Sequence, residues 1–329
     1  MVFVKKKIFY IILMIVIKKY YNNTEHRYNV AIGNFDGIHK GHKFLINKLI
    51  ELKKTDLDKI ALLTFHPHPV KVIYPEKWKK NIIRFRTKFR LLQKSGIDAL
   101  FIIAFNEKFR NLSSKDFIEN ILIKGIKAKN VLVGEDFKFG KNREGSIEDL
   151  QSHSIKRKFN LYTFKKIDFN GEIFSSSSIR NYLKIGEIEK CNRLLGYYWE
   201  VEDKVIKGEA RGRLLGFPTA NMNYNYQISP SNGIYACWVK IEKEKIWRMA
   251  AISSGIRPHY KGEKKILEIH ILDYEGNLYN KRLRVAFIKK IRNEEKFESE
   301  EKLIQQMKKD CIKVISVLKE NSIKNDNYC

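Results

Sequence analysis

Two histidines, His39 and His42, stand three residues apart in the stretch AIGNFDGIHKGHKFLINKL (residues 31–49), beside three glycines. A strand-like run precedes them and a helical pattern follows, which predicts a helix N-terminus, where free N–H groups favour anions. Imidazoles at i and i+3 can face the same way and donate hydrogen bonds to phosphate oxygens that gain charge in a transition state. Two histidines without a third ligand make a poor zinc site. On these residues alone, a metal site, a satisfied helix end and a phosphate site all stay open.

A run of serines with an arginine forms a second candidate site, in FSSSSIRNYLKIG (residues 174–186). Serines before a helix most often form a cap, but hydroxyls and an arginine there can also cradle a triphosphate. GNFDGIHKGH is similar to the GxFDGxHxGH signature of HxGH-class nucleotidyltransferases, and the serine segment resembles their SSTxxR-like motif, with serine in place of threonine. The resemblance replaces the metal interpretation with catalytic roles for His39 and His42. It implies that ATP is bound by Gly33, Asn34, Phe35, Asp36, Gly37, Ser175, Ser176, Ser177 and Arg180.

Two further segments resemble the bacterial FAD synthetase module. They are LTFHPHP (residues 63–69) and VLVGEDFKFGKNREG (residues 131–145). The histidines of the first segment are weak evidence, because histidines flanked by prolines are usually loop residues. From the second segment, the resemblance implies that Asp136, Phe137 and Arg143 bind the flavin.

The stretch GEARGRLLGFPTANM (residues 208–222) resembles the riboflavin kinase signature GRxLGFPTAN at every defined position. Its glycines let a loop approach phosphates closely, and its arginines add positive charge. Thr219 and Asn221 offer hard oxygen ligands, which suit magnesium with its nucleotide. A plain turn rich in Gly and Pro is the alternative. The predicted ATP-binding residues are Arg211, Gly212, Arg213, Gly216, Phe217 and Pro218.

A predicted strand, ILEIHILDY (residues 266–274), carries Glu268 on the face opposite its apolar residues. The simplest explanation is a half-solvated strand with its glutamate outside. The resemblance to the kinase motif LExHxLD implies that Glu268 is the general base for the flavin's terminal ribityl hydroxyl. The segment ISSGIRPHY (residues 252–260) departs from the family's NIGxRPTF at Ser253, Ser254 and His259, which puts local contacts of the kinase in doubt.

These sites require two kinds of scaffold. From residue 28 to about 185, strand-like and helical patterns alternate and the strands are continuously apolar, which predicts a Rossmann-like parallel sheet with helices on both faces. After about residue 197, strand-like runs predict an antiparallel β-barrel with one C-terminal helix capped by Ser299. The predicted parts are an N-terminal extension or first strand (1–27), an FMN adenylyltransferase domain (28–184) and a riboflavin kinase domain (185–320).

Composition restricts the surroundings of these domains. The 329 residues suit two domains, and the net charge of +27 favours polyanions. However, the lysines are spread along the whole chain, so no nucleic-acid partner is expected. An apolar run from Ile8 to Ile17 is far shorter than the roughly 20 residues that span a bilayer, so a buried first strand or an extension is predicted and no membrane partner is expected. A membrane-associated N-terminus is the alternative. Four cysteines without a CxxC pair indicate reduced thiols in a cytoplasmic protein.

Together the resemblances imply a bifunctional riboflavin kinase and FMN adenylyltransferase. The chain is expected to phosphorylate riboflavin to FMN and then to transfer AMP from a second ATP to FMN, which gives FAD and pyrophosphate. The expected ligands are riboflavin, FMN, FAD and ATP, with Mg²⁺ as cofactor. Three alternatives remain: a basic nucleic-acid-binding protein, a nucleotidyltransferase with another acceptor, and a chain in which only one domain is active. The kinase motif argues against the second alternative.

Overall fold

The structure, a computed structural model, describes residues 14–18, 26–156, 158–165, 168–169, 172–208, 211–224, 227–257 and 264–323. By compactness the chain forms two units. Unit 1 comprises residues 1–35, 41–78 and 89–167, and unit 2 comprises residues 36–40, 79–88 and 168–329. Two short segments of the N-terminal half therefore fold as part of unit 2. The apolar run that begins at Ile8 lies outside the described residues up to residue 13.

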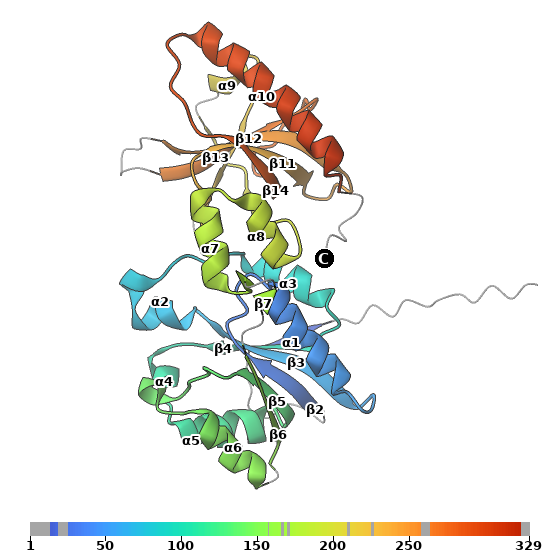
Figure 1. The fold of residues 1–329 in the computed structure, drawn as a ribbon, viewed down its shortest axis with the longest axis vertical. Coiled ribbons are helices and arrows are strands. Elements are labelled where there is room, and N and C mark those ends of the chain that lie inside the picture. The colour runs from blue at the N-terminus through green and yellow to red at the C-terminus, as the bar shows by residue number, and fades with distance from the viewer. Residues whose placement is uncertain are drawn as a thin grey trace, which may run out of the picture. The chain divides into compact units, whose positions relative to one another are not determined.

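Unit 1 is built on a parallel sheet with the strand order β1-β4-β3-β2-β5-β6 (Figure 1). The strands are β1 (Ile15–Ile17), β2 (Arg27–Ile32), β3 (Asp58–His66), β4 (Ala99–Ala104), β5 (Ala128–Gly134) and β6 (Asn160–Phe164). Nearly all residues of β2 and most of β3 and β5 are buried, as expected for strands that are covered on both faces. The predicted parallel sheet is confirmed.

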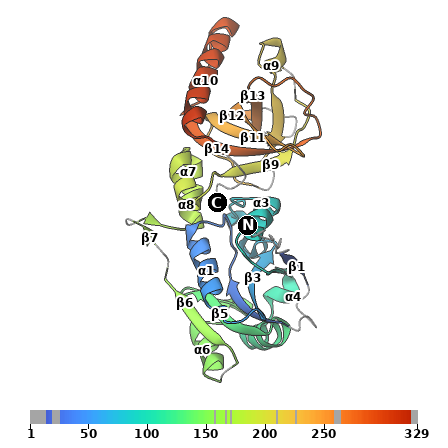
Figure 2. The ribbon, with the colours of Figure 1, turned by 90° about the vertical axis from the view of Figure 1, so that its right-hand side faces the viewer.

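Helices connect these strands and lie on both sides of the sheet (Figure 2). They are α1 (Lys40–Glu51), α2 (Pro69–Ile73), η1 (Pro75–Lys77), α3 (Phe85–Gln93), α4 (Glu107–Arg110), α5 (Ser114–Asp116), the π-helix η2 (Phe117–Gly125), η3 (Lys141–Arg143) and α6 (Ile147–Ile155). The buried side of η2 packs against one face of the sheet, where Phe117 and Ile121 join the core that contains Val30 and Leu63. This packing covers the apolar residues of the central strands.

Unit 2 contains an antiparallel sheet with the strand order β10-β13-β12-β11-β14-β9. Its strands are β9 (Glu200–Lys204), β10 (Ala220–Asn223), β11 (Gly233–Ile241), β12 (Trp247–Arg257), β13 (Lys264–Ile271) and β14 (Arg282–Arg292). Ile206, just after β9, forms a bridge to Asn221 of β10, so the two edges of the sheet meet. The sheet is therefore a nearly closed barrel, as predicted.

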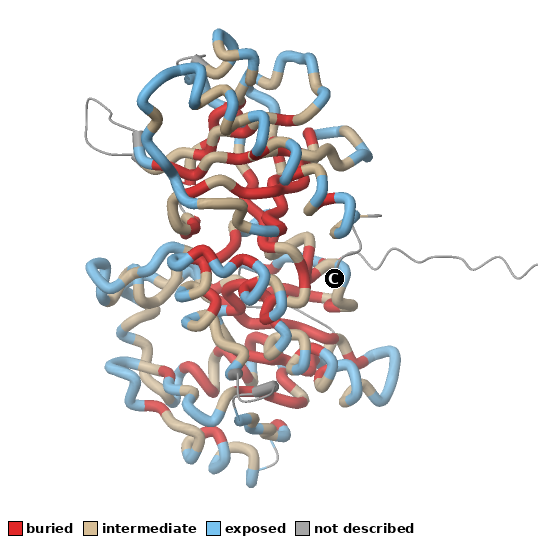
Figure 3. Tube along the Cα trace, turned by 45° about the horizontal axis from the view of Figure 1, so that its top comes forward, coloured by how far each residue is buried: buried red, intermediate tan, exposed pale blue. Residues whose placement is uncertain are grey.

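Helices complete unit 2. They are α7 (Ser176–Ile185), α8 (Ile188–Leu195), the single turn α9 (Arg211–Leu214) and α10 (Glu300–Glu320), with a short hairpin of β7 (Asp168–Phe169) and β8 (Glu172–Ile173). Ser299 caps α10, since its hydroxyl accepts the N–H of Lys302 at 3.3 Å. The buried side of α10 packs on the barrel. In Figure 3 the buried stretches, in red, lie mostly in the interior, and the exposed ones, in pale blue, lie mostly at the outside.

Truncating the buried side of α10 should destabilise the protein. Leu318 is 0% exposed and packs in the cluster with Trp238 and Ile288. Leu318→Ala is therefore expected to lower the free energy of unfolding by about 2–5 kcal/mol, measured by urea denaturation. Ile312→Ala on the same helix is the control, because Ile312 is 69% exposed and should change stability by less than about 0.5 kcal/mol. Equal losses in the two variants would contradict the packing described for α10.

Candidate active sites

The loop from β2 to α1 carries the histidine motif and is sharply bent. The N–H of Gly33 continues the sheet by donating to the Leu63 carbonyl at 3.0 Å. Beyond it, Phe35, Gly37 and Ile38 have φ angles of +45°, +92° and +40°. Non-glycine residues in this region are uncommon, and such strain is concentrated at functional sites. Helix α1 begins at Lys40, directly after His39, so the predicted helix start at the histidine motif is confirmed.

The two histidines have different surroundings. His39 directly precedes α1 and is only 6% exposed, and burial lowers its pKa to about 4. Its imidazole is therefore neutral near pH 7, with one N–H as donor. His42 lies in the first turn of α1, and its ring centroid is 5.2 Å from that of Phe35. The site can thus supply imidazole hydrogen bonds at a helix N-terminus, but His39 adds no positive charge.

In unit 2, the predicted ATP-binding residues Asp36 and Arg180 form an ion pair with each other. The Asp36 carboxylate also accepts the backbone N–H of Ile82, at 3.0 and 3.1 Å to its two oxygens. Arg180 donates further to the carbonyls of Ser176 at 3.1 Å and Lys80 at 3.4 Å. The guanidinium is therefore held by protein groups on several sides. It anchors the loop that carries Asp36.

The three predicted serines begin α7 and have different roles. The hydroxyl of Ser175 is the N-cap and accepts the N–H of Ser178 at 3.0 Å. Ser176 donates to the carbonyl of Asp36 at 2.8 Å, which ties the start of α7 to the histidine motif. Ser177, in the position of the family's threonine, is exposed at the first turn. The side chain of Ser177 is the one that a phosphate could reach without displacing another contact of the cap.

The predicted flavin residues of unit 1 share one loop after β5. The side chains of Asp136 and Arg143 are exposed. Phe137 is half-buried and stacks on Phe139, with ring centroids 5.4 Å apart and planes at 18°. Phe139 and Gly145 exchange backbone hydrogen bonds of 3.1 and 2.8 Å, which close the loop. The loop therefore presents one carboxylate and one guanidinium beside a pair of stacked aromatic rings.

The second cluster of predicted residues lies in unit 2, where the kinase-like loop folds back on itself. The N–H of Phe217 donates to the Gly212 carbonyl at 2.7 Å. A Cβ at Gly212 would come within 2.4 Å of the Phe217 carbonyl oxygen, so only glycine fits there. The next turn needs Gly216, with φ of +83°. The Pro218 carbonyl lies 3.0 Å from Nδ1 of His270 on β13, which fixes the loop against the barrel.

The structure describes the side chain of only one of the two arginines in this loop. Arg213 is exposed. Arg211 begins α9, and its side chain lies outside the described part of the structure.

The predicted metal residues and the predicted base meet on one face of the barrel. In the pairing of β10 with β13, Asn221 is directly opposite Glu268. Thr219 precedes Asn221 by two residues along the extended chain, so its side chain shares that face. Gly208 also packs there, because a Cβ on it would lie 2.0 Å from the Asn221 amide nitrogen. The structure thus brings together an amide, a hydroxyl and a carboxylate beside the glycine-rich loop.

The segment that departs from the family pattern is partly described. Ser253 is opposite Glu268 in the pairing of β12 with β13. Ser254 is fully buried and lies 2.9 Å from the hydroxyl of Tyr224, so it is a barrel residue. The side chain of Arg257 and residues 258–263, which include His259, lie outside the described residues.

Residues outside the motifs also contact the predicted site, and the sequence analysis missed them. Tyr197 donates to the carbonyl of Gly37. Trp199 and Gln227 both donate to the carbonyl of Ile82, the residue whose N–H binds Asp36. No local pattern marks these residues, because a buried aromatic or amide side chain in a strand-rich region reads as an ordinary core residue.

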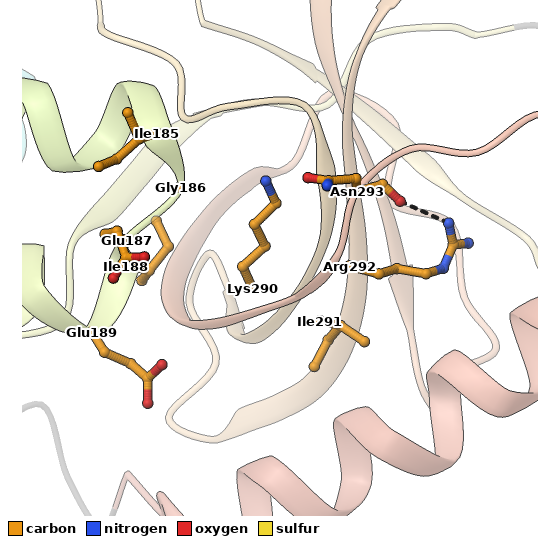
Figure 4. A pocket seen from close by; sticks show the side chains of 9 residues that line it. All are labelled: Ile185, Gly186, Glu187, Ile188, Glu189, Lys290, Ile291, Arg292 and Asn293. Carbon is orange, nitrogen blue, oxygen red and sulfur yellow. Dashed lines mark hydrogen bonds between the residues drawn. The ribbon is translucent and has the colours of Figure 1, made fainter.

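A groove of unit 2 lies apart from every predicted residue (Figure 4). It is formed by the turn between α7 and α8 and by the end of β14. Lys290 lies in it and donates to the hydroxyl of Ser231 at 2.8 Å. Burial lowers the pKa of Lys290, and the nearby Glu187 opposes this change.

Over the described parts of the chain, no three His, Cys, Asp or Glu side chains come together in a way that could bind a metal ion. No helix of the described structure has the length and apolar character needed to cross a membrane.

Known proteins resemble the chain over both units. It matches the family model of FAD synthetase over residues 21–178 and that of riboflavin kinase over residues 195–318. A bifunctional riboflavin kinase/FMN adenylyltransferase of Buchnera aphidicola subsp. Schizaphis graminum is 35% identical over 284 residues, which cover 85% of this chain and 91% of the relative. The protein of the same name from Escherichia coli strain K12 is 34% identical, with 85% and 90% covered. A solved structure described as a macrolide-efflux protein from Streptococcus pneumoniae matches with a TM-score of 0.80 and 28% identity, over 91% of this chain and 97% of that chain.

Acid should destabilise the fold through His39. Its folded pKa of about 4 lies below the ordinary 6.5, so between these values the unfolded chain binds more protons. The free energy of unfolding should therefore fall as the pH falls through this window, by at most about 1.4 kcal/mol per pH unit for this group. His39→Gln should reduce that slope between pH 6.5 and 4.5, measured by urea denaturation at each pH. The exposed His66→Gln is the control, and identical slopes for His39→Gln and wild type would contradict the expectation.

Proposed function

Because the chain belongs to the family of bifunctional riboflavin kinase/FMN adenylyltransferases, we propose residue roles for both steps of FAD synthesis. The protein phosphorylates riboflavin to FMN with ATP, and it transfers AMP from ATP to FMN to give FAD. We assign the first step to the residues 185–320 and the second to residues 28–184. The observation that carries the assignment of the first step is the pairing that sets Glu268 opposite Asn221 beside the glycine-rich loop.

In the kinase step, Glu268 accepts the proton of the terminal ribityl hydroxyl. The hydroxyl oxygen then attacks the γ-phosphorus, the bond to the β-phosphate oxygen breaks, and ADP leaves. The backbone of the loop around Gly212 and Gly216 approaches the phosphates of ATP, and Arg211 and Arg213 offset their charge. Phe217 and Pro218 hold the loop in place against His270, as the contacts to His270 suggest.

Magnesium would be held by few protein ligands. Thr219 and Asn221 offer a hydroxyl and an amide oxygen, the hard donors that this ion accepts, and the ion usually takes its remaining ligands from water and substrate phosphates. When bound, it would offset charge on the transferred phosphoryl group.

In the adenylyltransferase step, the FMN phosphate is the nucleophile and is already ionised near pH 7. One of its oxygens attacks the α-phosphorus of ATP, and pyrophosphate leaves. The chain therefore has to position the reactants and stabilise charge, without a general base. His39 and His42 donate to phosphate oxygens at the start of α1, together with the backbone of residues 33–37 and the exposed Ser177. Asp36, Ser175, Ser176 and Arg180 shape this surface through the contacts between them.

The flavin of FMN would contact the loop after β5. We assign Asp136 and Arg143 to its polar groups, because both side chains are exposed on the same loop as the stacked Phe137.

One incubation separates the two activities. The protein is mixed with riboflavin, ATP and magnesium, and the flavins are separated by chromatography. FMN without FAD would remove the adenylyltransferase assignment. No product from riboflavin, with FAD formed from supplied FMN, would remove the kinase assignment.

Removing the proposed base should affect one activity only. Glu268→Gln keeps the size of the side chain but cannot take the proton, so FMN formation should fall at least about 100-fold while FAD formation from FMN stays unchanged. Glu275→Gln, at an exposed glutamate just beyond β13, is the matched control and should leave both activities intact. Loss of both activities in Glu268→Gln would indicate a structural role instead.

Removing an imidazole at the start of α1 should have the reverse effect. His42→Ala should slow FAD formation by about 100-fold or more, because losing one preorganised donor to the transition state usually costs that much. FMN formation should be unaffected, and His66→Ala should change neither rate. If FAD formation in His42→Ala stayed within about threefold of wild type, the proposed role would be refuted.

A further inference from the structure

Two segments that the FAD synthetase model covers are built into the unit of the β-barrel. We name residues 36–40 the histidine loop and residues 79–88 the brace. Both lie within the FAD synthetase match at residues 21–178, yet both fold with residues 168–329. The histidine loop contains His39, one of the two proposed phosphate-binding histidines. Its conformation therefore depends on residues that the riboflavin kinase model covers.

The backbone N–H and carbonyl of Ile82 link the brace to the histidine loop on one side and to Trp199 and Gln227 on the other. Its N–H donates to the Asp36 carboxylate of the histidine loop, at 3.0 and 3.1 Å. Its carbonyl accepts Nε1–H of Trp199 at 2.7 Å and Nε2–H of Gln227 at 2.9 Å. Gln227 donates in addition to the carbonyl of Glu200, the first residue of β9, at 2.6 Å. Ile82 and Trp199 are 0% exposed and Gln227 is 1% exposed, so water cannot replace these hydrogen bonds.

A second contact reaches the histidine loop directly. The Tyr197 hydroxyl donates to the carbonyl of Gly37, two residues before His39, and the tyrosine is 4% exposed. Gly37 has a φ of +92°, and a Cβ on it would lie 3.2 Å from Ile82 and 3.4 Å from Leu195. At Gly37 the loop is thus packed closely against the brace and α8.

We propose that Tyr197, Trp199 and Gln227 are positioning residues for adenylyl transfer, although they lie in the part of the chain that resembles riboflavin kinase. They hold the backbone of Gly37 and Ile82, and through it Asp36 and His39. A displacement of about 1 Å at a reacting group can cost about 100-fold in rate. The kinase base Glu268 lies on β13 and is not held by these contacts. The proposal rests on the proposed function, since it assigns these residues to the FAD-forming step.

The lead test is Tyr197→Phe, which removes one hydroxyl and keeps the ring. FAD formation from FMN should lose about tenfold in kcat, with KM for ATP and for FMN within about twofold of wild type. FMN formation from riboflavin should stay unchanged. Tyr235→Phe is the matched control: Tyr235 is equally buried, and its hydroxyl binds Ser231 within the barrel region. Both variants should lose similar stability by thermal denaturation, so a loss of FAD formation in Tyr197→Phe alone cannot come from stability.

Two further variants test the mechanism. Gln227→Met removes both donated hydrogen bonds at nearly constant size and should likewise slow FAD formation only. If Tyr197 acts through His39, then Tyr197→Phe should add little in a His39→Ala background, so the double variant should be less impaired than the product of the two single effects. If the rate loss in the double variant equalled the product of the two single losses, Tyr197 would act independently of His39, and the proposed action through His39 would be wrong.

The outcomes distinguish a failure of the proposed function from a failure of the positioning role. If the wild-type protein formed no FAD from FMN, the proposed function would fail. If the wild type formed FAD while Tyr197→Phe kept its kcat, or lost FMN formation in parallel, the positioning role would be wrong and the proposed function would stand.

Discussion

A carboxylate that is removed from water has to be paired, and Asp36 meets this requirement with one guanidinium and one peptide N–H. Breaking such a buried pair leaves an uncompensated charge, which usually costs about 3–5 kcal/mol. Arg180 lies on α7 and Ile82 lies in the brace. The carboxylate of Asp36 therefore joins the histidine loop, the brace and α7, which are distant in the sequence. Gly37, with its positive φ, and the buried His39 follow directly after this anchor.

Most of the scaffold could be predicted from the sequence. The continuously apolar runs at 60–63 and 131–133 predict strands covered on both faces, and all residues of these two runs are buried. The change of rhythm near residue 197 predicts the barrel, and Ser299 predicts the start of α10. These features depend on local periodicity and capping chemistry, which short stretches of sequence contain.

The arrangement of side chains within the sites could be predicted less well from the sequence. The motif residues are recognisable, but nothing in the sequence indicates that Arg180 binds Asp36 or that the Ser175 hydroxyl caps α7. Pairing of Asn221 with Glu268 depends on the register between two strands, which the whole barrel determines. Trp199 and Gln227 could not be identified for a related reason. Both donate to the carbonyl of Ile82 in a distant segment, and nothing in the type of an aromatic or amide residue indicates such a partner.

The hydrogen bond from Tyr197 to Gly37 spans 160 residues of chain. At the ordinary rate of protein synthesis, the histidine loop leaves the ribosome on the order of 10 s before the tyrosine that holds it. The parallel sheet of unit 1 can form during that interval, but residues 36–40 and 79–88 must wait for α7, β9 and the loop before β11. The nascent chain therefore carries its phosphate-binding motif in an unfinished form until residues up to Gln227 have been made, so the histidine loop is completed only after synthesis of the β-barrel has begun.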